Sequence, residues 1–384
     1  MSRDHKIQEL LELEQGRQEK SHKFIASENY ASDDVSYFVG SVFSNKYCEG
    51  YPGRRYYNGC LNFDKLEKHG NATLRNLYGC KFSNIQPHSG ANANLAVYKA
   101  FLNPGDTTLG MSLTDGGHLS HGSSANISGQ WFKPKFYGVN PNGLIDYQEV
   151  YNKAQEIRPQ LLIAGASAYP RRIDWKAFRE IADSINCKLL VDMAHYSGLI
   201  AGGVYPNPLP YADIVTSTTH KTLRGARGGM ILWNDEKYTR RINSAVFPGV
   251  QGGPLMNQVA GKAQAFYEAT HPDFKKYAVD VVRAAKLMCE VFIERGINVI
   301  TGGTDSHIVL VGTGQKTGAD VANTLEEKHC IIVNKNTIPN DKRSVMKTSG
   351  IRLGTAAMVT KKGFDVSYFK DIANKVSDVI LEGV

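Results

Sequence analysis

The sequence lacks the features that define several large classes of protein. Its 384 residues contain no apolar run near the roughly 18 residues of a membrane helix, and the N-terminus leads into Leu and Glu rather than an apolar leader. The six cysteines show no C-x-x-C spacing, repeats and low-complexity stretches are absent, and no nucleic-acid-binding motif accompanies the net charge of +8. We therefore expect a soluble, cytoplasmic, globular protein with reduced thiols, whose charge weakly favours an anionic ligand.

The chain contains instead an alternation of helical segments and short apolar strands. We expect helices at 92–102 and 175–186, and strands at 107–113, 161–167, 188–194, 212–217 and 229–233. This alternation predicts an α/β fold in which helices cover both faces of a mostly parallel sheet. Further along, we expect a long helix over Phe274 to Gly296, a helix near 318–329, a closing helix from Tyr368, and strands at His307–Val311, Ile331–Asn334 and Gly350–Gly354.

Three parts are expected: an N-terminal helical arm (1–44), a large α/β domain (45–270) and a smaller C-terminal α+β domain (271–384). The arm opens with the amphipathic stretch I-Q-E-L-L-E-L-E, which is suited to packing on a second subunit. Within residues 28–60, the stretch S-N-K-Y-C-E-G-Y-P-G-R-R-Y-Y-N-G is interrupted by Gly and Pro. It predicts a long irregular loop with a functional role.

Lys221 lies in the segment T-S-T-T-H-K-T-L-R-G-A-R-G-G (216–229), behind a run of hydroxyl side chains. The preceding A-D-I-V predicts a buried strand that delivers Lys221 to its carboxyl end, where ligands bind in α/β sheets. A lysine whose pKa is lowered by burial or by a nearby cation forms a Schiff base with a carbonyl compound or with pyridoxal phosphate. An exposed turn lysine fits the same window.

Two further segments contain candidates for holding a ligand. Ser89 and Gly90, in P-H-S-G-A-N, precede a helix whose free N–H groups would attract a phosphate, although an ordinary N-cap fits equally. Asp192 ends the strand in V-D-M-A-H. Its carboxylate would keep a heteroaromatic ring nitrogen protonated, or it would cap the following turn.

Three more residues have two interpretations each. His118, in D-G-G-H-L-S-H-G, would stack on a planar ring or lie on the surface; with His121 it lacks a third metal ligand, so no metal site is expected. Glu49, crowded by tyrosines, would have a raised pKa and donate a proton, unless it is solvated. Arg352, inside a strand, needs a carboxylate from a substrate or from an internal acid. Together these are the parts that a pyridoxal-phosphate enzyme acting on an amino acid needs.

These motifs resemble those of the serine hydroxymethyltransferase family, and the match extends nearly from end to end. The stretches that carry it are I-A-S-E-N-Y (25–30), N-K-Y-C-E-G-Y-P-G-R-R-Y-Y (45–57), Q-P-H-S-G (86–90), D-G-G-H-L-S-H-G (115–122), V-D-M-A-H (191–195), T-T-H-K-T-L-R-G (218–225), F-P-G-V-Q-G-G-P-L-M (247–256) and V-N-K-N (333–336).

The resemblance implies a pyridoxal-phosphate-dependent transferase of fold type I, with the cofactor covalently bound to Lys221 and tetrahydrofolate as co-substrate. The implied reaction is reversible transfer of the serine hydroxymethyl group to tetrahydrofolate, giving glycine and 5,10-methylenetetrahydrofolate in one-carbon metabolism. A homodimer or a dimer of dimers with shared active sites is implied as well.

Residue roles follow from the same resemblance. Catalytic roles are implied for Lys221, Glu49, His118, Asp192 and Tyr57. Cofactor contacts are implied for Ser89, Gly90, His118, Ser167, Asp192, His195, Thr218, His220 and Lys221, with Gly252 and Gly253 completing the phosphate site of the neighbouring subunit. Substrate contacts are implied for Ser27, Tyr47, Glu49, Tyr57, His195 and Arg352, with Arg352 on the carboxylate, and folate contacts for Leu113, Gly117, Leu119 and Asn336.

The chain departs from the family pattern at three alanines. Ala91 lacks a second hydroxyl for the phosphate, and Ala226 and Ala356 stand where proline is usual. One alternative is therefore a folate-independent aldolase or transaldolase acting on threonine-like or α-methylated β-hydroxy amino acids. A pyridoxal-phosphate protein with a regulatory or nucleic-acid-binding role is a further alternative, motivated only by the +8 charge.

Overall fold

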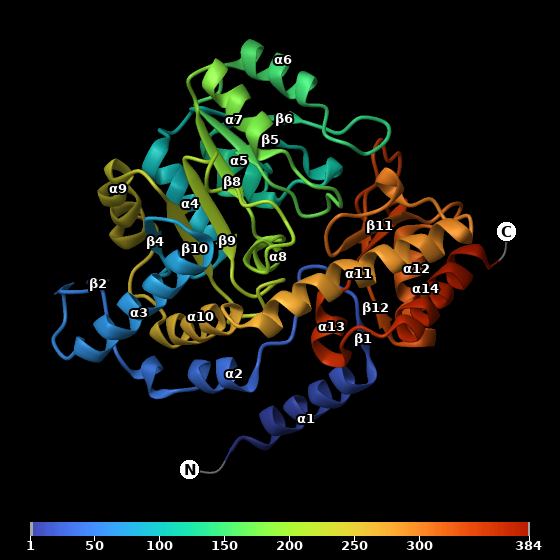
Figure 1. The fold of residues 1–384 in the computed structure, drawn as a ribbon, viewed down its shortest axis with the longest axis horizontal. Coiled ribbons are helices and arrows are strands. Elements are labelled where there is room, and N and C mark those ends of the chain that lie inside the picture. The colour runs from blue at the N-terminus through green and yellow to red at the C-terminus, as the bar shows by residue number, and fades with distance from the viewer. Residues whose placement is uncertain (1–2, 383–384) are drawn as a thin grey trace.

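The computed structural model describes residues 3–382, and its centre is a seven-stranded sheet (Figure 1). The strand order is β4-β10-β9-β8-β7-β5-β6. β10 runs antiparallel to both of its neighbours, and the other five strands pair in parallel. The strands are β4 (Phe82–Asn84), β5 (Thr107–Met111), β6 (Lys133–Tyr137), β7 (Leu161–Ala164), β8 (Lys188–Asp192), β9 (Ile214–Thr218) and β10 (Gly229–Trp233). The predicted mostly parallel α/β sheet is confirmed.

The sheet is covered on both faces because successive strand residues point to opposite sides. In β7, Leu161 and Ile163 share one core with Val97 of α4, whereas Leu162 belongs to a second core with Phe178 of α7. The helices of this part are α3 (Leu61–Tyr78), α4 (Gly90–Phe101), α5 (Ile127–Trp131), α6 (Tyr147–Ile157), α7 (Trp175–Ser184), α8 (Ser197–Ala201), α9 (Thr239–Ser244) and α10 (Met256–Ala269).

The C-terminal part is built on a three-stranded antiparallel sheet in the order β11-β14-β13. The strands are β11 (Ile308–Gly312), β12 (Ile331–Ile332), β13 (Asn334–Asn336) and β14 (Gly350–Gly354), and the helices are α11 (Pro272–Glu294), α12 (Gly318–His329), α13 (Ala356–Lys362) and α14 (Val366–Leu381). The predicted helix at 318–329 and the strand at 350–354 are confirmed. The single strand predicted at 331–334 is wrong, because β12 pairs with β1 (His22–Lys23) whereas β13 pairs with β14.

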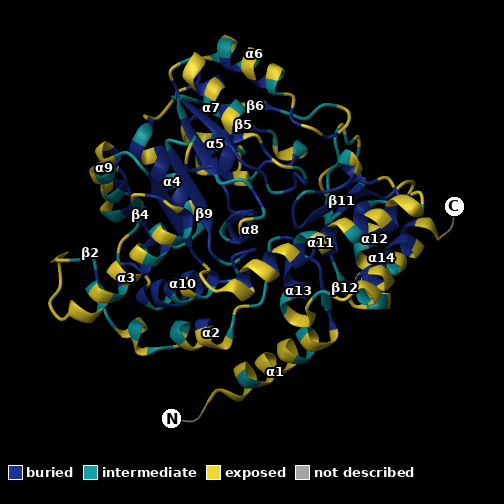
Figure 2. Ribbon diagram, in the orientation of Figure 1, coloured by how far each residue is buried: buried dark blue, intermediate teal, exposed yellow. Residues whose placement is uncertain are grey.

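The N-terminal part lies along the outside of the molecule. α1 (His5–Lys20) has no buried residue, and Figure 2 shows it as a mainly exposed helix at the edge of the fold. α2 (Asp33–Val39) was not predicted; it lies before the predicted irregular stretch, and the Ser32 hydroxyl caps it by accepting from Val35 N–H. Within the predicted irregular stretch, the strands β2 (Gly50–Tyr51) and β3 (Arg54–Arg55) have only two residues each.

The domain boundaries at 44/45 and 270/271 stay predictions, and residues 1, 2, 383 and 384 of the outer two parts lie outside the described residues. α10 ends at Ala269 and α11 begins at Pro272, which is compatible with the second boundary. No helix between residues 3 and 382 has both the length and the apolar character needed to cross a bilayer.

Candidate functional site

Lys221 lies in a cavity of about 350 Å³ at the carboxyl ends of β8 and β9. Its side chain is buried, with 7% of the residue exposed. Burial lowers the pKa of the amine to about 8; the charges of Arg352 and Arg227 act in the same direction and Asp192 opposes them. Lys221 is therefore a buried amine that is about one tenth unprotonated at pH 7, far more than an ordinary lysine, and the interpretation as an exposed turn lysine is wrong. We call this space the Lys221 cavity.

Asp192 enters the cavity from the end of β8. Its Oδ2 accepts from Asn94 Nδ2 (2.9 Å) and from His121 Nε2 (3.0 Å), while its Oδ1 accepts from Ala194 N–H (3.0 Å). Burial by itself would raise the pKa of this carboxyl, but the hydrogen bond and charge of His121 hold it well below its usual range. Asp192 is therefore an ionised carboxylate that caps the turn and also faces the cavity.

An anion-binding helix start forms another wall of the cavity. Ser89 is the N-cap of α4 and its hydroxyl accepts from Asn92 N–H (3.1 Å), so the first N–H groups of the helix have no partner within the helix. A Cβ at Gly90 would lie 2.7 Å from Thr218 Cγ2, so only glycine fits between the helix and β9. Ser89, Gly90 and Ala91 all line the cavity, and this arrangement fits a phosphate group.

The side chain of His118 lines the same cavity. Ser120 N–H donates to His118 Nδ1 (3.2 Å), and burial, with the charge of His121, lowers the pKa of this imidazole to about 4. His118 is therefore neutral near pH 7, and a neutral imidazole can stack on a flat ring. Other predicted residues that line the cavity are Ser27, Ser167, His195, Thr218 and His220.

Arg352 lies in β14, and its guanidinium has hydrogen-bond partners but no acidic partner among residues 3–382. Its Nε donates to Asn334 Oδ1 (3.0 Å) and its Nη1 donates to Ser167 O (2.6 Å). Among residues 3–382, no carboxylate lies within ion-pair distance of the guanidinium, and burial lowers its pKa to about 10. The internal acid considered from the sequence is thus excluded for the described chain, and a ligand carboxylate remains the candidate partner.

A second group of predicted residues lies together at a different place. A Cβ on Gly253 would lie 2.9 Å from the Tyr47 ring, a Cβ on Gly252 would lie 3.7 Å from Glu49 Oε1, and the Tyr47 and Tyr57 rings are 5.6 Å apart. In the part of the chain that the structure describes, none of these five residues lines the Lys221 cavity. We call them the Glu49 cluster.

The 45–57 loop, which carries Tyr47, Glu49 and Tyr57, is held in place by hydrogen bonds of Arg55. Arg55 Nε donates to Asp64 (2.8 Å) and Nη2 donates to Glu67 (2.6 Å), while Nη1 donates to the carbonyls of Cys48 and Gly50. These bonds place both sides of Glu49 on a fixed backbone. Tyr47 and Tyr57 stay 62% and 45% exposed, so the cluster presents an open aromatic surface.

The predicted folate residues lie on two segments: Leu113, Gly117 and Leu119 follow β5, and Asn336 ends β13. Leu113 and Leu119 are 44% and 50% exposed, and Gly117 packs so closely on Met111 O that a Cβ would lie 2.2 Å from it. Thr337, the residue after Asn336, donates to Thr114 O (2.8 Å). The loop at 113–119 and the end of β13 are therefore adjacent, as a shared ligand site requires.

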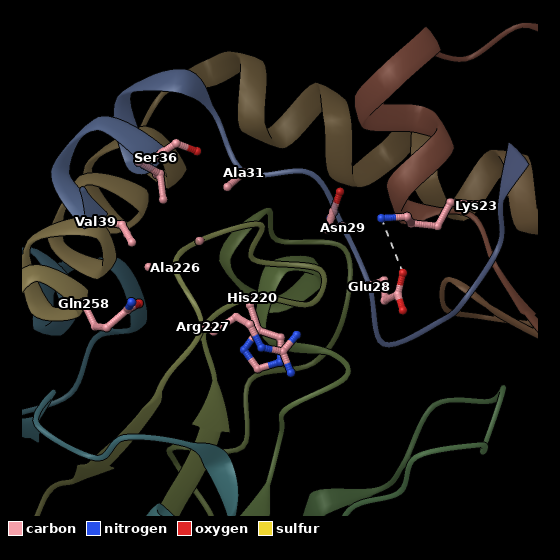
Figure 3. A pocket seen from close by; sticks show the side chains of 12 residues that line it. Lys23, Glu28, Asn29, Ala31, Ser36, Val39, His220, Ala226, Arg227 and Gln258 are labelled. Atoms are coloured by element: carbon pink, nitrogen blue, oxygen red, sulfur yellow. Dashed lines mark ion pairs between the residues drawn. The ribbon is translucent and has the colours of Figure 1, made fainter. Parts of the chain in front are cut away.

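A second cavity of about 420 Å³ adjoins the first, and Figure 3 shows its lining. Glu28, His220 and Arg227 line both cavities. In Figure 3 the side chains of His220 and Arg227 lie side by side, and Glu28 pairs with Lys23 across 3.4 Å. The Lys221 cavity thus extends past these residues towards α2.

Sequence reasoning did not assign His121, Asn94, Arg227 or Glu28 to the site. For Asn94 a signal existed, since a polar residue lies one helical turn after Gly90 on the buried side of α4. His121 was considered only for a metal, although the three-residue spacing from His118 brings both rings to one place, 5.6 Å apart.

Comparison with known proteins agrees with this geometry. A family model described as serine hydroxymethyltransferase matches residues 1–376. The serine hydroxymethyltransferase of Wolbachia sp. subsp. Drosophila simulans is 52% identical over 380 residues, which is 98% of this chain and 89% of that protein. The proteins of the same name from Ehrlichia canis and Chromohalobacter salexigens are 51% and 50% identical over 98% of this chain, covering 91% and 90% of their own lengths.

Proposed function

This chain belongs to the serine hydroxymethyltransferase family, and from that premise we propose how its residues share the work of the reaction. The enzyme has the fold of type I pyridoxal-phosphate enzymes and interconverts serine and glycine with tetrahydrofolate. The folate-independent aldolase is not favoured, because the family and the relatives carry the name of the folate-linked enzyme.

One observation supports the division of roles most strongly: the cavity brings a buried amine with a pKa of about 8 together with an ionised carboxylate and a helix N-terminus. When bound, pyridoxal phosphate supplies an aldehyde and an electron-withdrawing ring that stabilises negative charge at the amino-acid Cα. Lys221 would hold the cofactor covalently, Asp192 would keep its ring nitrogen protonated, and Ser89 with Gly90 would bind its phosphate. His118 would cover the ring, and Ser167, Thr218, His195 and His220 would line its edges.

The substrate groups are assigned by charge and position. Arg352 would bind the serine carboxylate, because its guanidinium has hydrogen bonds to an amide and a carbonyl but no acid within residues 3–382. Ser27, on the wall of the cavity, would help to hold the same end of the substrate. Two fixed ends orient the bond that breaks, which is how positioning contributes to rate. Leu113, Gly117, Leu119 and Asn336 would contact the folate.

We propose that the Glu49 cluster works in the cavity of a second copy of this chain. Glu49 would move the proton at the serine hydroxyl, with Tyr47 and Tyr57 beside it, and Gly252 and Gly253 would complete the phosphate site. The separation of the cluster from the Lys221 cavity supports this proposal, as do the exposed Leu10 and Leu13 on α1, which suit burial against a partner. A dimer would then be the smallest active unit.

We also propose a cytoplasmic location, which is supported by the six free cysteines of the described chain. The test of the whole assignment is the formation of glycine from serine by the purified protein, with and without tetrahydrofolate. We expect glycine only when tetrahydrofolate is present. Equal glycine formation without it would favour the folate-independent aldolase.

A further inference from the structure

His195 and His307 form a buried pair behind the Lys221 cavity. Both are almost fully buried, with 2% and 0% of the residue exposed, and their ring planes differ by only 17°. His195 Nδ1 lies 3.3 Å from His307 Nε2. His195 follows β8 and lines the cavity, whereas His307 directly precedes β11 in the C-terminal part.

The backbone carbonyl of Ala26 determines which nitrogen atoms of the two imidazoles carry hydrogen. His307 Nε2 is also 3.1 Å from Ala26 O, and a carbonyl oxygen only accepts hydrogen bonds. His307 Nε2 therefore carries a hydrogen, which it shares between Ala26 O and His195 Nδ1. Two N–H groups facing each other at 3.3 Å would repel, so His195 Nδ1 has no hydrogen.

Both rings are neutral in this environment. Burial lowers the pKa of His307 to about 3 and holds the pKa of His195 well below its usual range, and the charges of Lys221 and Arg352 act in the same direction on both rings. A neutral imidazole has one N–H, so the hydrogen of His195 must be on Nε2, the nitrogen that does not face His307.

We propose that His307 is a positioning residue that fixes His195 as the Nε2–H tautomer, so that His195 presents a hydrogen-bond donor to the ligand of the Lys221 cavity. The proposal rests on the role given above to His195, and it adds the residue that sets that role. Which ring nitrogen of a histidine is protonated is commonly set by the bond that the other nitrogen makes.

Ala26, the third residue of this hydrogen-bonded group, connects the histidine pair to the part of the cavity proposed to bind the substrate. Ala26 immediately precedes Ser27, which lines the cavity. The segment is held closely against β14, since Gly354 N–H donates to Phe24 O (2.8 Å) and a Cβ at Gly354 would lie 2.3 Å from Ala26 Cα. One shared hydrogen therefore joins the segment of Ser27, the turn of His195 and the start of β11.

The first test needs neither cofactor nor activity. We suggest nitrogen NMR of cofactor-free protein labelled with ¹⁵N-histidine, with the two rings assigned from single variants. We expect both rings to be neutral near pH 7 and protonated at Nε2 alone. Protonation of His195 at Nδ1 would overturn the proposal. Because the spectrum is recorded without substrate, failure of the proposed reaction would leave this result standing.

The second test compares two variants of His307 in the cofactor-loaded protein. His307→Leu keeps the volume and removes the donor, whereas a glutamine in His307→Gln has two N–H bonds for Ala26 O and His195 Nδ1. We expect His307→Leu to lower kcat for serine about 10- to 100-fold and His307→Gln to stay within about threefold, both with the visible cofactor absorption retained. Equal losses in the two variants, or none in His307→Leu, would contradict the positioning role.

Discussion

A lysine amine reacts with an aldehyde only in its unprotonated form, and burial increases the fraction of Lys221 in that form near neutral pH. Desolvation penalises the ammonium, and the guanidinium groups of Arg352 and Arg227 disfavour it further. Asp192 limits the effect because its negative charge favours the ammonium. The resulting amine is nucleophilic enough to attack a carbonyl and is unprotonated often enough to do so.

The rate at which cofactor-free protein recaptures pyridoxal phosphate should follow this pKa. Lowering pH protonates the amine, so the rate should fall below about pH 8 and level off above it. The measurement is the recovery of the visible cofactor absorption after mixing, across the pH range. A rate that keeps rising to the 10.5 of an ordinary lysine would contradict the environment described for Lys221.

Arg352→Lys should weaken serine binding with little effect on cofactor binding. A lysine keeps the charge but loses the planar fork that matches a carboxylate, and bonds to charged groups are worth about 1.5–3 kcal/mol. We expect KM for serine to rise about 10- to 100-fold at unchanged cofactor absorption. An exposed arginine on α11, Arg283, offers a matched control, since Arg283→Lys should leave KM as it is.

The sequence predicted the burial of Lys221, Asp192 and Arg352, because Asp192 and Arg352 lie in expected strands and Lys221 follows one. The Asp192 partners could not be predicted from spacing, since Asn94 and His121 reach it from α4 and from the turn after β5. His307 gave no local signal. Its function depends on contacts with His195 and Ala26, which lie 112 and 281 positions away.

At the scale of elements, the start of α4 has a helix cap and the candidate phosphate site at the same residues. The Ser89 hydroxyl accepts from Asn92 N–H and donates to Asn92 Oδ1 (2.8 Å), which leaves the backbone N–H groups of Gly90 and Ala91 for an anion. The cap at Thr317 on α12 has the same pattern, accepting from Asp320 N–H (3.1 Å) and donating to Asp320 Oδ2 (2.6 Å).

Comparing variants of these two caps distinguishes an effect on stability from an effect on ligand binding. Ser89→Ala and Thr317→Ala should each destabilise the fold by about 1 kcal/mol, which is the usual cost of losing an N-cap. Only Ser89→Ala should also raise the dissociation constant of pyridoxal phosphate, measured by absorption titration of cofactor-free protein. A similar loss of cofactor affinity in both variants would mean that the Ser89 effect is one of folding alone.

The elements themselves were largely predictable from apolar runs, and the errors have local causes. Strands expected to run to 113, 167 and 194 end at Met111, Ala164 and Asp192, because the chain turns away after each of them; after β7 and β8 the next residues include part of the cavity wall. α2 was missed because its short sequence D-D-V-S-Y-F-V has little periodicity, and it is stabilised by the Ser32 cap and by packing on α10.

At the scale of the whole molecule, the predicted site residues of one chain lie at two different places. The Lys221 cavity has most of the residues proposed to hold the cofactor, whereas the Glu49 cluster has those proposed to act at the hydroxymethyl end. A symmetric pair of chains would bring each half to its complement twice. No sequence pattern predicted which residues share one cavity, because that depends on how the 45–57 loop is anchored by Arg55.

Mixing two inactive variants tests this arrangement. Lys221→Ala and Glu49→Gln should each be inactive as pure dimers. After mixing and exchange, half of the dimers are hybrids, and each hybrid has one site with both groups intact, so activity should recover to about a quarter of the wild type. If each site were built from one chain, no hybrid site would be complete and no activity would return.

The most direct test of the central claim is borohydride reduction of the cofactor-loaded protein, followed by proteolysis and mass mapping of the adduct. The structure predicts a single reduced pyridoxyl adduct on the peptide that contains Lys221, and none on the other buried lysines of the described chain, Lys23 and Lys262. An adduct at any other lysine, with Lys221 unmodified, would contradict the account.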